Sequence, residues 1–199
     1  MTEDRLILAS TSPRRLQLLK QIGVDPMSVL EADIDEIPLK AEKPYEFAKR
    51  MAFAKATKIF NSNKDKYILA ADTVVAIGRL ILPKAKTEEE VQKSLTLLGG
   101  RNHRVYGGIC LIQPGGKVFQ KLVETRVFMR RLSSDEVSNY VSCGEWKGKA
   151  GSYAIQGKGG QYIKKISGSY TNVVGLDLYT TSKLLKGCGL TFRQTNGQI

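Results

Sequence analysis

Apolar runs and helical patterns alternate along the chain, separated by polar turns. Residues 5–9 (RLILA) form an apolar run suited to a buried strand, and the run stops at residues 10–13 (STSP). Ser12 suits the position just before a helix, Pro13 suits the first helical position, and Gly23 suits the helix end. The chain is therefore expected to open with a strand, a loop and a helix.

The same patterns predict the remaining elements. The strongest buried-strand signal is residues 67–77 (YILAADTVVAI), which Gly78-Arg79 can join in a hairpin to residues 80–82. Residues 26–40 indicate a strand followed by an acidic loop. We expect further helices at 44–61, from the capping residues 87–90 to Gly99-Gly100, after the capping residues 133–136 and at 177–185, and further strands at 104–112, 117–130 and 162–166.

Hairpin signals and helical crossovers occur together in this order of elements. That combination is typical of an α/β (α+β) fold with a mixed, twisted β-sheet flanked by helices. The 199 residues, 42% of them hydrophobic, suffice for one domain or for two lobes that share a sheet. We expect a single domain over residues 1–193 and a polar C-terminal tail at residues 194–199.

The net charge of +12 indicates an anionic partner, either nucleic acid, anionic lipid or a polyphosphate metabolite. The lysines and arginines are scattered, and the tightest clusters are pairs such as Arg14-Arg15. A membrane-binding segment would be denser in basic residues. The chain also lacks the interleaved aromatic and basic residues that bind single-stranded nucleic acid, so nucleic acid is the least favoured partner.

The cysteines and the N-terminus bear on localisation. Cys110, Cys143 and Cys188 are far apart and odd in number, and His103 is the single histidine, so a Cys/His zinc site is excluded. This usage indicates a reducing, cytoplasmic setting. The N-terminus does not have the pattern of a signal peptide, and no stretch approaches the roughly 18 apolar residues of a membrane span.

Two arginines stand in the first turn of the first predicted helix. A plain capped helix start accounts for Ser12 and Pro13, but not for Arg14 and Arg15. The positive end of a helix dipole disfavours each cation by about 0.3–1 kcal/mol. The arginines are explained if an anion docks there, because free N–H groups and guanidinium groups both bind phosphate.

Asp72 is the only charged residue in its eleven-residue apolar run. A buried carboxylate requires a cation, a metal or strong hydrogen bonds, although it can also cap a neighbouring loop. Lys55 shares an apolar helical stripe with Ala48, Ala52 and Ile59. Its side chain is therefore expected to point inward or along the wall of a cleft, unless its ammonium group snorkels to the surface.

The acidic loop offers Asp35 and Glu36 as further carboxylates. Magnesium usually takes one or two carboxylates together with phosphate oxygens and waters. Asp72 and Glu36 would suffice if the fold brings them together, and a solvated acidic loop is the alternative. Lys84 is expected on a loop at a strand end and, taken alone, has no assigned role.

Residues 151–160 (GSYAIQGKGG) superficially resemble a P-loop. However, five residues instead of four separate Gly151 from Gly157-Lys158, and Gly159 replaces the magnesium-binding Ser or Thr, so a P-loop is excluded. The glycines still allow the backbone to approach a ligand closely. Gln156 can both donate and accept hydrogen bonds, as reading a nucleobase edge requires.

Together these segments resemble the Maf-type nucleoside triphosphate pyrophosphatases from Leu6 to about Leu185. Each motif is weak alone, but their order and spacing are specific. The resemblance implies two lobes with a nucleotide-binding cleft between them. The motifs that carry it are residues 9–15 (ASTSPRR), 34–36 (IDE), 54–56 (AKA), 71–74 (ADTV), Lys84, 149–157 (KAGSYAIQG), 168–170 (GSY) and 173–176 (VVGL).

The resemblance also implies the reaction. It implies hydrolysis of the α–β phosphoanhydride to a nucleoside monophosphate and pyrophosphate, with Mg²⁺ or Mn²⁺ as cofactor. Asp72 falls at the general-base position, and Glu36 at an acidic position associated with metal or water, although either can be the base. Arg14 or Arg15, Lys55 and Lys84 fall at phosphate-contacting positions, with Ser12 in the same loop.

Three positions relate to substrate choice. Arg14, Thr73 and Gln156 look like the branch that prefers dTTP and UTP, while modified pyrimidine nucleotides stay open as substrates. The family is linked to cell-division arrest and its members are usually homodimers. The competing hypothesis is a nucleotide-binding regulator of cell division that hydrolyses little.

Two departures from the family pattern are visible. Ala85 follows Lys84 where the family generally has proline, and Asp177 replaces the proline of a Leu-Pro-Leu pattern. Asp is itself a good helix starter. Both changes are interpreted as loop or helix-start variation that leaves the implied chemistry in place.

Overall fold

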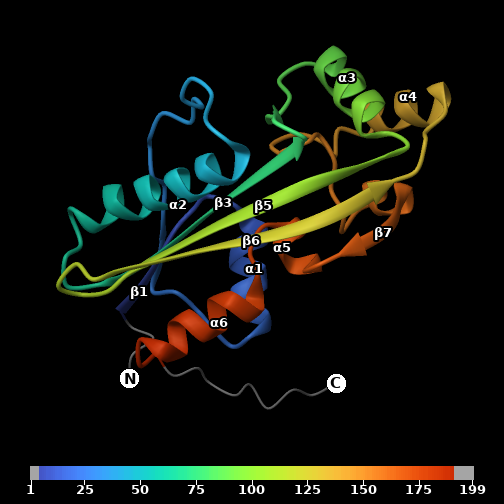
Figure 1. Ribbon diagram of the computed structural model, residues 1–199. Coiled ribbons are helices and arrows are strands. Elements are labelled where there is room, and N and C mark those ends of the chain that lie inside the picture. The colour runs from blue at the N-terminus through green and yellow to red at the C-terminus, as the bar shows by residue number, and fades with distance from the viewer. Residues whose placement is uncertain (1–4, 191–199) are drawn as a thin grey trace, which may run out of the picture.

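The computed structural model describes residues 5–190, and over this range the strands form one seven-stranded mixed sheet (Figure 1). The spatial order is β2-β1-β3-β5-β6-β7, with β4 paired to β3. The strands are β1 (Leu6–Ala9), β2 (Ser28–Leu30), β3 (Tyr67–Ile77), β4 (Leu80–Leu82), β5 (Arg101–Ile112), β6 (Val118–Met129) and β7 (Ile163–Ser167). The predicted α/β class with a mixed sheet is confirmed.

The helices also follow the predicted order. They are α1 (Pro13–Gln21), α2 (Pro44–Phe60), α3 (Glu88–Leu98), α4 (Ser134–Ser142), the 3-10 helix η2 (Lys158–Tyr162), α5 (Tyr170–Val174) and α6 (Leu178–Gly187). The sequence analysis missed η2 and α5, because five residues are too few to show a helical period. The predicted domain end at residue 193 and the tail at 194–199 lie outside the described residues.

The helix starts show where side-chain capping succeeds. Ser133 and Glu136 form the predicted capping box, and Asp177 accepts a hydrogen bond from the Thr180 N–H. Asp177 thus starts α6 without the family's proline. At α3 the box is incomplete, since the Glu90 carboxylate accepts from the Lys86 N–H. Ser12 occupies the N-cap of α1 without a side-chain capping bond.

One edge of β3 is covered at both ends and open in the middle. The parallel strand β1 pairs with residues 67–69, and the antiparallel strand β4 pairs with residues 75–77. The opposite edge pairs continuously with β5. Among the described strands none pairs with residues 70–74 on the first edge. Asp72 and Thr73 therefore lie in a gap of the sheet.

Alternating side chains of β3 face two different helical layers. Ile68 and Ala70 pack with α2, whereas Leu69 and Ala71 pack with α1 and α6. This period of two places Asp72 on the α2 face and Thr73 on the α1 face of the same strand. The two neighbouring residues in the gap consequently meet different helices.

A close approach of backbone holds α2 against the sheet. A Cβ at Gly108 of β5 would collide with the Ala48 carbonyl oxygen of α2. Glycine is therefore required at this position on steric grounds. Because α2 lies this close, Lys55 can reach the open edge of β3.

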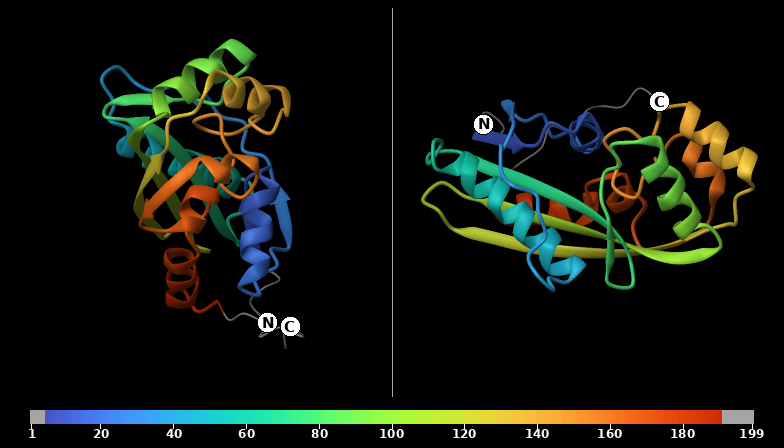
Figure 2. Two further views of the ribbon diagram at one scale, coloured as in Figure 1. Left: turned by 90° about the vertical axis from the view of Figure 1, so that its right-hand side faces the viewer. Right: turned by 90° about the horizontal axis from the view of Figure 1, so that it is seen from above.

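Two hydrophobic cores lie at opposite ends of the long strands. One is formed with α3 and α4 and includes Leu95 and Tyr140, and the other is formed with α1 and α6 and includes Leu19 and Leu185. Figure 2 shows α3 and α4 together at one end and α1 and α6 at the other. The molecule thus has two lobes on a shared sheet.

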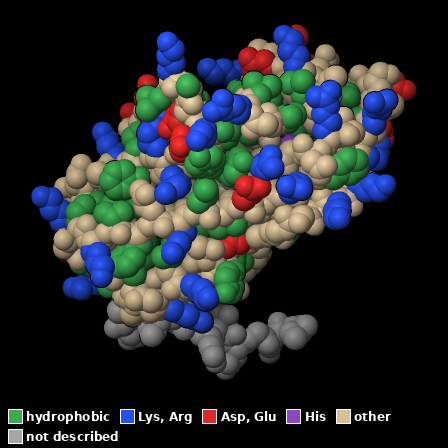
Figure 3. All heavy atoms as spheres, in the orientation of Figure 1, with side chains coloured by type: hydrophobic (Ala, Val, Ile, Leu, Met, Phe, Trp, Pro, Cys, Tyr) green, Lys and Arg blue, Asp and Glu red, His purple; other side chains and the backbone are tan. Residues whose placement is uncertain are grey.

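None of the helices between residues 5 and 190 is both long and apolar enough to cross a membrane. Lysine and arginine side chains are spread over the face seen in Figure 3 and do not gather in one patch. On this face the positive charge is thus scattered, as the basic residues are along the sequence.

His103 supplies a testable pH dependence. It is buried, its Nε2 lies 2.8 Å from the Tyr153 hydroxyl, and burial lowers its pKa from 6.5 to about 4. Between pH 6.5 and about pH 4, His103 is protonated in the unfolded chain but stays neutral in the folded protein. Stability is therefore lost as the pH falls from about 6.5 towards 4, by up to about 3 kcal/mol.

The measurement is urea unfolding of the wild type and of His103→Gln across this pH range. The variant does not titrate there, so its stability is expected to fall less steeply with acid. Parallel stability curves for the two proteins would show that His103 is not held neutral by the fold.

Candidate active site

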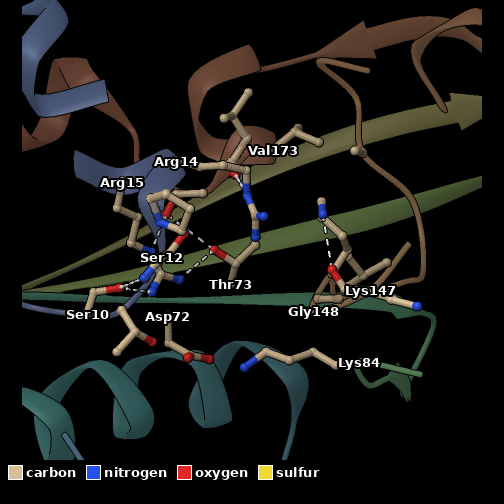
Figure 4. A pocket seen from close by; sticks show the side chains of 18 of the residues that line it. Ser10, Ser12, Arg14, Arg15, Asp72, Thr73, Lys84, Lys147, Gly148 and Val173 are labelled. Carbon is tan, nitrogen blue, oxygen red and sulfur yellow. Dashed lines mark hydrogen bonds between the residues drawn. The ribbon is translucent and has the colours of Figure 1, made fainter. Parts of the chain in front are cut away.

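A cleft of about 530 Å³ opens at the gap in β3 (Figure 4). Its walls come from the β1–α1 loop, the acidic loop after β2, α2, the loop after α4 and the end of α5. All the site residues expected from the sequence line it, namely Ser12, Arg14, Arg15, Glu36, Lys55, Asp72, Thr73, Lys84 and Gln156. The fold brings together residues that are up to 144 positions apart in sequence, from Ser12 to Gln156.

Lys55 is bound between two carboxylates. Its ammonium nitrogen lies 2.6 Å from Asp72 Oδ1 and 2.6 Å from Glu36 Oε1. The Lys55 side chain is only 9% exposed, so it points inward and does not snorkel. Lys84 extends the row, with its nitrogen 3.3 Å from Glu36 Oε2. The cation that a buried Asp72 requires is therefore Lys55.

The neighbouring lysines Lys55 and Lys84 lower the pKa of Glu36. Burial by itself raises the pKa of Glu36, but hydrogen bonds and charge from Lys55, followed by Lys84, outweigh it and hold the pKa below its usual value. Glu36 is thus a carboxylate at neutral pH. Removing a buried cation of this kind leaves a carboxylate without compensation, which is strongly unfavourable.

The carboxylates fit part of a metal site. Within residues 5–190 no group of three or more His, Cys, Asp or Glu side chains is placed to hold a metal ion. Asp72 and Glu36 nevertheless converge on one point, the Lys55 ammonium group. Two carboxylates match the set that magnesium uses when phosphate oxygens and waters supply the other ligands.

Arg15 is held by the protein itself. Its Nε donates to the Gly175 carbonyl at 2.9 Å, and its two terminal nitrogens donate to Ser10 Oγ and Thr73 Oγ1. Arg14 Nε likewise donates to the Val174 carbonyl at 3.3 Å. The two arginines therefore bind carbonyls at the end of α5, where a helix favours cations. These carbonyls are a second explanation for the two arginines, beside the docked anion that the sequence indicates.

Two further cations in the cleft were not predicted as site residues. Lys147 and Lys149 come from the loop after α4 and line the same cavity. Burial, followed by the charge of Arg14, lowers the pKa of Lys149. Burial also lowers the pKa of Arg14. In the sequence, alternation of lysine and glycine at 147–149 was the available signal, but it did not indicate which wall the loop would form.

Comparison with known proteins identifies the family of this chain. A family model described as Maf-like protein matches residues 5–188. The chain belongs to the Maf family. The implied membership is thereby confirmed over nearly the whole chain.

Three relatives align with nearly the whole of this Maf chain. A protein of Mesorhizobium japonicum named dTTP/UTP pyrophosphatase is 55% identical over 96% of this chain and 95% of its own length. Proteins with the same name are 54% identical in a Chelativorans species, over 93% of this chain and 91% of theirs, and 49% identical in Agrobacterium fabrum, over 100% and 98%.

Solved structures share the fold at low sequence identity. The HAM1 protein of Coxiella burnetii is 15% identical, with a TM-score of 0.54, and covers 92% of this chain and 98% of that one. The Staphylococcus aureus Ham1 protein is 16% identical, with a TM-score of 0.50 over the same shares. The two-lobed mixed sheet of this Maf chain is thus found in solved proteins.

The crowded cations predict an anion site. Inorganic pyrophosphate is expected to raise the melting temperature, and to do so less in about 0.5 M salt, because salt screens exposed charges. Arg14→Gln should weaken pyrophosphate binding about tenfold, the cost of one charged hydrogen bond. Differential scanning calorimetry measures the melting temperature, and isothermal titration calorimetry measures the affinity.

The matched control is Lys164→Gln, which removes one charge from an exposed position on β7. Its pyrophosphate affinity should stay within about twofold of the wild type. Equal losses in both variants would attribute binding to net charge and not to this cleft.

Proposed function

We propose that this Maf chain hydrolyses dTTP and UTP, and modified pyrimidine nucleotides of the same shape, between the α and β phosphates. The products are a nucleoside monophosphate and pyrophosphate. The observation that carries the proposal is the agreement between relatives about 50% identical over nearly the whole chain, named dTTP/UTP pyrophosphatase, and a cleft rich in cations.

The charge of the cleft suits a triphosphate. Six basic residues and three carboxylates line the cleft. The basic residues are Arg14, Arg15, Lys55, Lys84, Lys147 and Lys149, and the carboxylates are Glu31, Glu36 and Asp72. Fixed cations stabilise the charge that develops on a leaving pyrophosphate. Anion binding also relieves the repulsion between Arg14 and Lys149.

Asp72 is the proposed general base. It stands in the gap of the sheet, and the Lys55 ammonium group bound to Oδ1 fixes the orientation of its carboxylate. In this role Asp72 orients the attacking water and takes its proton. Glu36 binds the same ammonium group but is the more exposed of the two, with 42% of its side chain accessible against 11% for Asp72.

A divalent cation, Mg²⁺ or Mn²⁺, is part of the proposal. Glu36 and Asp72 would hold it, and it would neutralise phosphate oxygens and help to organise the leaving pyrophosphate. The protein residues would bind the triphosphate, orient the water and accept its proton.

Recognition of the base is assigned to Gln156, and Thr73 and Arg14 of the same cleft contribute to the choice of substrate. Thr73 Oγ1 is engaged by Arg15 at 3.2 Å, so its hydroxyl position is fixed by the protein. Gln156 is exposed at the cleft, and its amide offers both a donor and an acceptor. A pyrimidine edge carries both kinds of group.

Three broader features complete the proposal. We expect a homodimer, a cytoplasmic location and a contribution to cell-division arrest or to removal of unwanted nucleotides. The three cysteines are free in the structure, as a reducing compartment requires.

Product identification tests the reaction. The purified protein with magnesium and a panel of nucleoside triphosphates should release monophosphate and pyrophosphate from dTTP and UTP. Asp72→Asn should lower kcat by about a hundredfold or more while circular dichroism stays unchanged, because the base is lost and the side-chain shape is kept.

Release of nucleoside diphosphate and orthophosphate would contradict cleavage at the α–β bond. Full activity in Asp72→Asn would move the base to Glu36, for which Glu36→Gln is the matched variant. Nucleotide binding without turnover would favour the regulator that hydrolyses little.

Selectivity is tested at Gln156. Gln156→Glu replaces a donor with a second acceptor and adds negative charge, so kcat/KM for dTTP and UTP is expected to fall about tenfold or more. Steady-state kinetics across the same panel of nucleotides measure this. An unchanged profile would remove Gln156 from base recognition.

A further inference from the structure

The loop that carries Gln156 makes few backbone hydrogen bonds to the β-strands. It connects α4 to η2, and its first half is joined to the rest of the fold by an isolated bridge between Ala150 and Lys84 and by the Gly151 N–H, which donates to the Leu82 carbonyl. Neither contact reaches the segment around Gln156. That segment is held instead by buried side chains, including Tyr153 and Ile155, and by hydrogen bonds with side chains.

Glu145 accepts two of these hydrogen bonds from the start of the same loop. Its Oε1 accepts from the Lys158 N–H at 2.9 Å, and its Oε2 accepts from the Gly159 N–H at 3.1 Å. Both donors lie just after Gln156. One carboxylate thus satisfies two N–H groups at the start of η2.

Tyr140 holds the other side of Gln156. Its hydroxyl donates to Glu145 Oε2 at 2.8 Å and accepts from the Ala154 N–H at 3.0 Å. Tyr140 is anchored in the core of the α3–α4 lobe with 1% exposure. Through these bonds a rigid lobe is connected to the backbone on both sides of Gln156.

Two glycines make room for the network. A Cβ at Gly157 would collide with the Glu145 carboxylate, and a Cβ at Gly159 would lie 2.7 Å from the Ala154 carbonyl oxygen. The φ of Gly157 is −120°, which other residues adopt, so the carboxylate is what requires glycine there. The Gly157-Lys158-Gly159 pattern is therefore explained by Glu145 at Gly157 and by the Ala154 carbonyl at Gly159, and not by a phosphate.

We propose that Glu145 is a positioning residue for nucleobase selection, acting through the backbone that carries Gln156. It does not touch the substrate in this role. The inference rests on the proposed function of Gln156 and extends it to the Glu145–Tyr140 pair. Most of the side chains proposed to bind the phosphates lie on α1, α2 and the loop after β4, outside this network, whereas Lys147 and Lys149 share the loop with Glu145.

The chemistry requires a carboxylate at this position. Glu145 accepts three hydrogen bonds, two from backbone N–H groups and one from a hydroxyl. A glutamine has one acceptor oxygen, and its NH₂ group would face an N–H donor. Glu145→Gln should consequently loosen the Gln156 segment while it preserves the size of the side chain.

The test measures recognition of the nucleobase separately from recognition of the phosphates. Dissociation constants for dTTP, GTP and inorganic tripolyphosphate are measured by calorimetry with EDTA present, and kcat and KM with magnesium. In Glu145→Gln the affinity for dTTP should fall about tenfold and its preference over GTP by a similar factor. The tripolyphosphate affinity should stay within about twofold, and kcat should change less than KM.

A double-mutant cycle shows whether Glu145 acts through Gln156. In a Gln156→Ala background, Glu145→Gln should cause no further loss of preference for dTTP over GTP. Gly157→Ala pushes a methyl group against the carboxylate and should reproduce the loss, so it also serves if Glu145→Gln does not fold. Additive losses in the cycle would overturn the proposal.

Glu136→Gln is the matched control. Glu136 accepts from the Ser133 N–H and pairs with Arg130, outside the lining of the cleft. It should lower the melting temperature and leave selectivity unchanged. Equal losses for dTTP, GTP and tripolyphosphate in Glu145→Gln would reduce Glu145 to a general structural role. Failure of the wild type to hydrolyse any nucleotide would refute the proposed function alone, because the binding preferences are measured separately.

Discussion

The interrupted edge of β3 is the constraint on which the active cleft depends. β1 covers the first residues of β3 and β4 covers the last, and no strand within residues 5–190 pairs with the segment 70–74 between them on that edge. A strand edge that is not paired leaves space and exposes polar groups. The gap therefore places Asp72 and Thr73 where loops from both lobes can meet them.

Charge balance follows from that placement. Asp72 faces α2, so the nearest cation is Lys55, and Lys55 is shared with Glu36 from the acidic loop. Thr73 faces α1 and receives Arg15, which also binds the end of α5. The same side chains thus tie separate elements together and form the walls of the cleft, and a change at one of them acts on both stability and binding.

The two walls are held by different means. The phosphate-facing wall is built on regular elements, α1, α2 and β3, whose backbones are hydrogen-bonded internally. The wall with Lys149 and Gln156 is a loop. Hydrogen bonds to the Glu145 carboxylate and the Tyr140 hydroxyl hold its backbone where strand pairing does not. Loops carried on a rigid scaffold are common carriers of specificity.

The sequence by itself determined the local elements, because hydrophobic period, capping residues and turn glycines act over a few residues. It also indicated which residues carry chemistry, since Asp72 and Arg14 conflict with their local surroundings, and the motif order pointed to the family. Only the tertiary structure decided that Lys55 is the partner of Asp72, that Arg15 is satisfied by carbonyls, and that Lys149 joins the cleft. These pairings depend on strand order and on a gap in one sheet edge, which arise from contacts between residues far apart in the chain.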